Sequence, residues 1–213
     1  MTNQGMKKRG KILLIIMAAA VIILVAAAAV CYTMRNRGVE AVPSADFAAD
    51  SVVYYYQKDP LWKDDALGNS SYHMEDSGCL VSCIAAEIKM QGMEIPGLID
   101  ITPASLNKFF TKNKIYDSEG NVLWEQLEKF INANVVLKDA SDLEDGELDA
   151  LLENNICPIV RVRMHGDGNY HFVLIVSSCD GMYLCMDPLN EEKRTVPLSE
   201  FGNRIYSVRY IDK

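Results

Sequence analysis

The chain has 213 residues, enough for one domain of ordinary size and an additional segment. Six of its 21 Lys and Arg residues and none of its 29 Asp and Glu residues lie in residues 1–38. The remaining chain therefore holds 15 basic and 29 acidic residues, a net charge of −14. So acidic a domain repels phosphates, which argues against nucleic-acid binding and against contact with anionic lipid.

The N-terminal segment contains an uninterrupted apolar stretch. Residues 12–30 are nineteen apolar residues without a charge, and a helix of that length crosses the hydrocarbon core of a bilayer. Basic residues are concentrated before it, so we expect residues 1–11 in the cytoplasm and the rest outside. We therefore predict a transmembrane signal anchor at residues 12–32 and a single-pass location in the plasma membrane. A cleaved signal peptide is the alternative, although no small-x-small site directly follows.

Residues 33–52 are small, polar and weakly patterned, and we predict a linker there. The compact domain is expected to comprise residues 53–213, and its first half has helical spacing of apolar residues with start and stop signals. Four helices are predicted in this half: residues 79–91, 102–113, 121–134 and 145–155.

The second half of the domain has the composition of strands. Partly alternating or continuous apolar runs predict strands in residues 157–164, 171–178, 182–188 and 205–211. The sequence "CDG" at residues 179–181 is typical of a turn between two of them. Helices followed by antiparallel strands predict an α+β fold with the helical half packed on the sheet.

Five cysteines follow the apolar stretch, and their odd number leaves at least one thiol unpaired. None has zinc-ribbon spacing, and His73, His165 and His171 do not cluster with them, so no metal site is predicted. Cys179 and Cys185 flank the predicted turn asymmetrically, which argues against a disulfide across it. The five cysteines are Cys79, Cys83, Cys157, Cys179 and Cys185.

Cys79 lies in "DSGCLVSC", where a Ser-Gly turn meets the start of a predicted helix. The positive end of the helix dipole favours a thiolate there. Glu75 and Asp76 oppose this effect, so a nucleophilic Cys79 would need an imidazolium beside it. Packing in the core is the simpler interpretation of a cysteine on a helix. A disulfide with Cys83, one turn further on, would block the nucleophile.

A base for Cys79 follows from hairpin geometry. If the turn is centred at residues 179–181, residue i faces roughly residue 358 − i to 361 − i on the next strand, by the pairing rule of antiparallel strands. His171 then lies within about three positions of Asp187. A base and a carboxylate that orients it are what nucleophilic cysteine catalysis requires. His73 is the alternative base, but no carboxylate is placed to orient it.

A series of segments is similar in order to the papain-like cysteine peptidases of the bacteriocin-leader-processing type, the C39-like family, and especially to its stand-alone domains. The resemblance covers residues 54–211. It departs from the family pattern at Cys83, where a small or hydroxyl residue is common, and at "SSCDG", which replaces a glycine. The segments are "QKDPLWKDDALG", "SGCLVSCIAAEI", "TPASLNKFF", "VLWEQL", "ICPIVRV", "HFVLIVSSCDGMYLCMDP" and "IYSVRYI".

The resemblance implies a papain-like fold and an amide-cleaving activity without a cofactor. It implies Cys79 as nucleophile, His171 as general base, Asp187 as the residue that orients His171, and Gln57 as a side-chain donor of the oxyanion hole. We therefore expect a membrane-anchored cysteine peptidase facing outward, with a peptide or protein substrate. An inactive peptide- or glycan-binding module and an amide-to-amine transferase are the alternatives. The sequence leaves the oligomeric state open.

Overall fold

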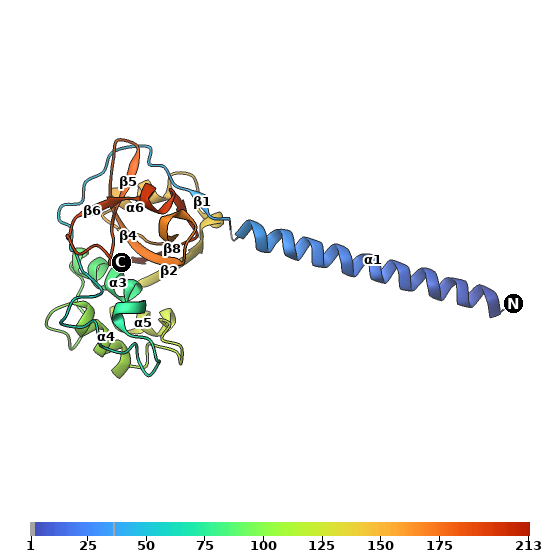
Figure 1. Cartoon of the computed structure of the whole chain (residues 1–213), viewed down its shortest axis with the longest axis horizontal. Helices are drawn as coiled ribbons and strands as arrows, with labels where there is room; N and C mark the ends of the chain where they lie inside the picture. The colour runs from blue at the N-terminus through green and yellow to red at the C-terminus, as the bar shows by residue number, and fades with distance from the viewer. Residues whose placement is uncertain (1–2, 36) are drawn as a thin grey trace. The chain divides into compact units, whose positions relative to one another are not determined.

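The computed structural model describes residues 3–35 and 37–213 and divides the chain into two compact units, Met1–Arg37 and Gly38–Lys213. In the first unit a single helix, α1 (Asn3–Arg35), is described. The second unit contains all the strands of the described chain and the remaining helices (Figure 1).

The transmembrane helix predicted at residues 12–32 is not supported. A helix that crosses a bilayer needs about 20 predominantly apolar residues. Among the residues that the structure describes, no helix reaches the length and apolarity that a membrane crossing requires. The N-terminal part of the fold prediction is therefore corrected.

The second unit is an α+β domain built on a six-stranded antiparallel sheet, in the order β2-β8-β3-β4-β5-β6. A separate two-stranded ladder joins β1 to β7. The strands are β1 (Val39–Glu40), β2 (Asn134–Asp139), β3 (Ile159–Arg163), β4 (Tyr170–Cys179), β5 (Met182–Met186), β6 (Thr195–Pro197), β7 (Arg204–Ile205) and β8 (Ser207–Asp212).

The helices α3, α4 and α5 group on one side of the sheet (Figure 1). α3 packs against β4, β3 and α4, and its interior positions from Val81 to Ile88 are buried. The helices are α2 (Met74–Ser77), α3 (Cys79–Met90), α4 (Pro103–Lys112), α5 (Trp124–Ile131) and α6 (Glu147–Glu153), with 3-10 turns η1 (Ala140–Asp142), η2 (Met164–Gly166) and η3 (Leu198–Phe201). All four predicted helices are confirmed, each somewhat shorter than its sequence pattern.

The hairpin of β4 and β5 has the turn that the sequence predicts. Cys179 pairs with Met182, so that Asp180 and Gly181 form a two-residue loop. Both loop residues have positive φ, 51° and 73°, as a type I′ turn requires. The register places Leu174 opposite Met186, within the range that hairpin geometry predicts.

Residues 38–52, which the sequence assigned to a linker, lie along the second unit and make specific contacts with it. We call residues 38–52 the strap. Val39 and Glu40 pair with β7, and Phe47 forms a two-way backbone pairing with Ser178 of β4. Ser44 donates from both its backbone and its hydroxyl to the Asp149 carboxylate. The strap thus ties β7, β4 and α6 together.

Candidate active site

Cys79 is the first residue of α3, as the sequence predicts, and is half-buried. Gly78 precedes it and donates its backbone N–H to Met74 O, which closes α2. A Cβ at position 78 would lie 2.5 Å from Met74 O. Only glycine fits this close approach of backbone to backbone, and it fixes how the chain turns into the helix that begins with Cys79.

His171 and Asp187 contact each other directly. His171 Nε2 lies 2.7 Å from Asp187 Oδ1, and both side chains are almost entirely buried. Asp187 Oδ1 also accepts the backbone N–H of Leu189 at 2.8 Å. A backbone N–H two residues further along the chain thus fixes the carboxylate that binds the imidazole of His171.

The hairpin register explains this contact. His171 is the second residue of β4, and Asp187 directly follows the last residue of β5. Since Leu174 is paired with Met186, Asp187 reaches the ladder near the start of β4. Residues diagonal to each other on neighbouring strands are within reach of long side chains.

The Cys79 side chain lies near enough to the His171 imidazole to influence its pKa. Burial acts to lower the pKa of His171, but hydrogen bonding to Asp187 and to Cys79, together with their negative charge, raises it to about 9. The imidazolium form of His171 is thus favoured at neutral pH. The ring of Phe201, in η3, lies 6.1 Å from the imidazole, centre to centre, and is tilted by 42° to it.

Gln57 is buried and bridges the segments that carry Cys79 and Asp187. Its backbone N–H donates to Pro188 O at 2.8 Å, and its side-chain Nε2 donates to Glu75 O at 2.7 Å. Its Oε1 is buried without a partner among the described residues. The amide nitrogen has a second hydrogen that this contact leaves available.

A cavity of about 570 Å³ opens beside Cys79, between the helical half and the sheet. On the helical side the cavity is lined by α3 and by the loop before α5. On the side of the sheet it is lined by β2, β4 and β8. Its lining includes Cys79, Trp124, Leu137, Tyr170, Phe172 and Arg209. Arg209 lies in the predicted strand "IYSVRYI", but nothing in the sequence indicates that it faces this cavity.

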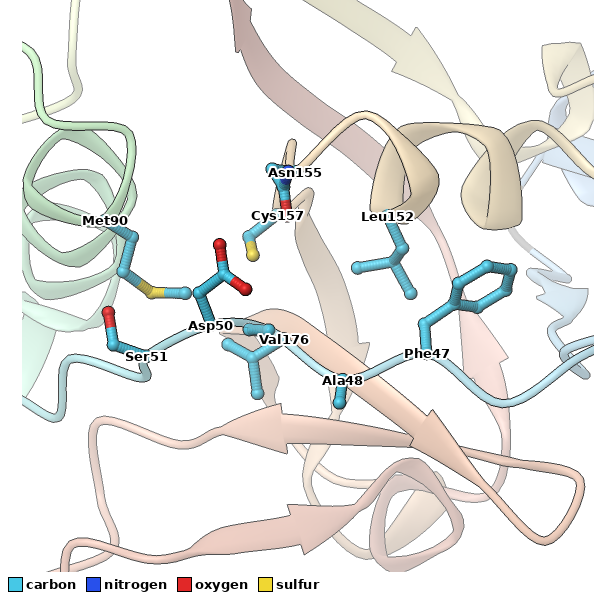
Figure 2. Close-up of a pocket in the computed structure, with 10 residues that line it drawn as sticks. Phe47, Ala48, Asp50, Ser51, Met90, Leu152, Asn155, Cys157 and Val176 are labelled. Carbon is cyan, nitrogen blue, oxygen red and sulfur yellow. The ribbon is translucent and has the colours of Figure 1, made fainter.

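A smaller cavity, of about 140 Å³, lies at the other end of α3, beside Met90. Figure 2 shows the strap running along it between Met90 and Leu152. Cys157 lines this cavity, and burial raises the pKa of its thiol to about 12. No histidine is among the described residues that line this cavity.

The other predicted candidates lie elsewhere or are buried. Cys83 is fully buried, its Sγ lies 3.5 Å from Phe172 O, and burial raises the pKa of its thiol well above the ordinary value. The five cysteines from Cys79 onward are all free, so Cys79 and Cys83 form no disulfide. His73 and His165 are exposed on the surface, outside the contact between His171 and Asp187.

The fold is similar to that of a solved peptidase-like structure. A protein of Bacillus anthracis proposed to be a C39-like peptidase superposes with a TM-score of 0.52 at 13% sequence identity, covering 80% of this chain and 99% of its own. At this identity the likeness concerns the fold. No family model matches the sequence, and no curated protein matches it either.

Proposed function

We propose that this protein is a cysteine peptidase that hydrolyses amide bonds through Cys79, His171 and Asp187. The observation that carries the proposal is the His171 imidazole, held at 2.7 Å by Asp187 and near enough to Cys79, at the start of α3, for that cysteine to raise its pKa. The C39-like fold supports it independently. Of the five cysteines from Cys79 onward, Cys79 alone is half-buried, whereas Cys179 is exposed and the other three are buried.

In the proposed mechanism the Cys79 thiolate attacks the substrate carbonyl carbon, and the C–S bond forms. His171 in its imidazolium form then donates a proton to the leaving amine as the C–N bond breaks, which leaves a thioester. A water molecule loses a proton to His171 and attacks the thioester. The C–S bond breaks, the acid product leaves, and the thiolate and imidazolium are restored.

Gln57 is proposed as a donor to the oxyanion that develops in both steps. Its Nε2 carries a hydrogen beyond the one given to Glu75 O, and its position between the segments of Cys79 and Asp187 supports this role. The backbone N–H of Cys79 would be the second donor. A neutral amide stabilises the oxyanion without changing its own protonation.

Alkylation kinetics test the proposal. The full chain is treated with iodoacetamide near neutral pH, and the modification rate of each cysteine is followed by peptide mass spectrometry. Exposed Cys179 is an internal reference, since the nearby Asp180 carboxylate raises the pKa of its thiol. Cys79 is expected to react at least about 10-fold faster than Cys179, and His171→Ala should abolish the difference.

Equal rates at the two cysteines, or a rate at Cys79 unaffected by His171→Ala, would overturn the proposal and favour a binding module. Cys83→Ala is the matched control, because it removes a neighbouring thiol without touching the imidazole. Hydrolysis of peptides by the wild type, absent in Cys79→Ala, completes the test.

The substrate as a peptide or protein, and the location of the domain outside the cytoplasm, stay predictions. The location can be tested by adding protease to intact and to lysed cells. A domain outside the cytoplasm is degraded in both, whereas a cytoplasmic domain is degraded only after lysis.

A further inference from the structure

One wall of the cavity beside Cys79 is a face of the sheet that carries arginines and aromatic residues. Arg161 of β3 pairs with Phe172 of β4 and with Ser207 of β8. Directly paired residues point to the same face, as do residues two apart on one strand. Arg209 therefore shares this face with Arg161 and Phe172, and it lines the cavity that contains Cys79.

The guanidinium groups stack on aromatic rings. Cζ of Arg209 lies 4.7 Å from the ring centre of Phe172 and 5.8 Å from that of Trp124. Cζ of Arg161 lies 4.4 Å from the ring centre of Tyr170. Such stacking fixes the plane of a guanidinium while leaving its N–H groups in the ring plane free to bind.

Few of these N–H groups have partners. Nη1 of Arg209 donates to Ser207 Oγ at 2.9 Å, while the Nε atoms of both Arg161 and Arg209 are buried and find no partner in the part of the chain that the structure describes. Among the salt bridges of the described chain, none involves either guanidinium. The two Nε atoms are closed to solvent, so the donor that a group in the cavity can reach is Nη2 of Arg209, which has no hydrogen bond among the described residues.

The charge on Arg209 is also poorly compensated. Burial and, to a smaller extent, the neighbouring charge of Arg161 lower its pKa to about 10, although the charge of Asp139 opposes them. Arg209 still carries its charge at neutral pH. Asp76 and Glu119 line the same cavity, but both are exposed and screened by solvent at its rim.

We propose that Arg209 is a specificity-determining residue that binds a carboxylate of the substrate peptide, close to the bond that Cys79 attacks. The inference rests on the proposed peptidase function. A guanidinium forms paired hydrogen bonds with a carboxylate, and Phe172 and Trp124 offer apolar surface to the methylene groups that carry it. An Asp or Glu side chain and a free peptide C-terminus share this chemistry.

The experiment first finds cleavage sites by digesting a complex peptide library with the full chain and with Cys79→Ala as blank. One cleaved sequence is then synthesised in three forms: C-terminally amidated with Glu near the scissile bond, amidated with Gln in its place, and with Gln and a free C-terminus close to that bond. kcat and KM are measured for each form with wild type, Arg209→Met, Arg209→Lys and Arg194→Met.

For the wild type, kcat/KM is expected to be on the order of 10-fold higher for a carboxylate-bearing form than for the amidated Gln form. The form that gains identifies the source of the carboxylate. Arg209→Met should abolish the preference, mainly through KM, and Arg209→Lys should retain part of it. Arg194 is exposed and bound to Glu192 on the surface, so Arg194→Met should keep the full preference.

Equal cleavage of all three forms by the wild type would overturn the inference and leave the peptidase function standing. The same holds if Arg209→Met is folded by circular dichroism and keeps the full preference. An absence of any cleavage above the Cys79→Ala blank would instead contradict the proposed function. The wild-type comparison needs no variant, so it decides the question even if Arg209→Met folds poorly.

Discussion

One oxygen atom of Asp187, Oδ1, contacts both the imidazole of His171 and the backbone N–H of Leu189. The carboxylate therefore sets the orientation of the ring and also contributes negative charge that favours the imidazolium. These two effects can be separated, since an asparagine keeps the oxygen acceptor and removes the charge.

We expect Asp187→Asn to lower peptidase activity about 10-fold at its optimum and to move the alkaline limb of the pH–rate profile downward. The wild-type limb should lie near pH 9, where His171 loses its proton. Without the charge of Asp187 the pKa of His171 falls. Asp187→Ala, which also loses the acceptor, should be less active still. An alkaline limb at the same pH in Asp187→Asn would contradict this account.

Glu87 is a second buried acid, on α3 two turns beyond Cys79. Its Oε1 accepts the backbone N–H of Ile211 at 2.7 Å, while Oε2 is buried without a partner among the described residues. Burial raises its pKa to about 8, although the bond from Ile211 opposes the rise. At neutral pH the carboxyl group is therefore mostly protonated.

Glu87 should make stability depend on pH. Its folded-state pKa lies above the ordinary value of 4.5, so its contribution is fully present below pH 4.5 and is lost as pH rises through about 8. Glu87→Gln has an uncharged side chain of similar shape at every pH. Its free energy of unfolding should therefore decline less as pH rises, and above pH 8 it should exceed that of the wild type by a few kcal/mol. Urea unfolding of both proteins from pH 5 to pH 9 measures the free energy of unfolding. If it changes with pH in the same way in both, Glu87 is not the group responsible.

At the scale of elements, the strap holds α6 through one buried carboxylate. The Asp149 carboxylate accepts three hydrogen bonds. The backbone N–H of Ser44 donates at 2.8 Å, the Ser44 hydroxyl at 2.5 Å, and the Tyr183 hydroxyl at 2.5 Å. Burial acts to raise the pKa of Asp149, but these hydrogen bonds outweigh it and lower the pKa. Stability from Asp149 is therefore present above its unfolded-state pKa and lost as pH falls through its folded-state pKa.

Ser44→Ala should destabilise the domain by about 1 kcal/mol at pH 7, because the hydroxyl donor to Asp149 is lost. The difference from the wild type should shrink as pH falls through the lowered pKa of Asp149, where its carboxylate becomes protonated and accepts the Ser44 hydroxyl less strongly. Chemical denaturation at pH 7 and at lower pH checks both statements. Ser118→Ala is the matched control, since Ser118 is exposed. A loss of equal size in that variant would show that the bond to Asp149 is not responsible.

The elements also show what local sequence patterns can predict. The four helices and the strands β3, β4, β5 and β8 have clear periodicity or turn signals, and they were predicted. β2 was not predicted, because only two residues separate "NVVLKD" from the end of α5 and because it pairs with β8 at the far end of the chain. β1 and β6 have two and three residues, too few for any period to appear.

The residues of the candidate site also differ in whether a local sequence pattern can predict their position. His171 and Asp187 lie on one hairpin, so ladder geometry places them together from sequence alone. Arg209 comes to the cavity through the pairing of β8 with β3, a contact between distant segments that no local pattern encodes. Gln57 is a candidate only through the resemblance to the C39-like family. Its contacts to Pro188 and Glu75 join segments that are distant in the sequence, so no local pattern predicts them.

At the scale of the whole molecule, the boundary between the two compact units lies between Arg37 and Gly38. The strap belongs to the second unit: it forms β1, pairs with β4 and buries Ala41 and Pro43. A fragment that begins at residue 38 keeps every one of these contacts, whereas one that begins at residue 53 loses them all.

We therefore expect residues 38–213 to fold with the stability of the second unit in the full chain. Residues 53–213 should be less stable by at least about 2 kcal/mol, because backbone partners of β7 and β4 are left open and apolar surface is exposed. Thermal unfolding of the two fragments measures the difference. Equal unfolding midpoints would mean that the strap contributes nothing to the domain.

The close approach at Gly78 has a consequence for how this sequence can vary. The atom that blocks a side chain there is Met74 O, part of the main chain, so no replacement of a neighbouring side chain can make room. In a saturation-mutagenesis library selected for activity, position 78 should admit glycine alone, and second-site suppressors of its substitutions should be absent. The residue before the sulfur would then be as invariant as the sulfur itself, although it contributes no functional group.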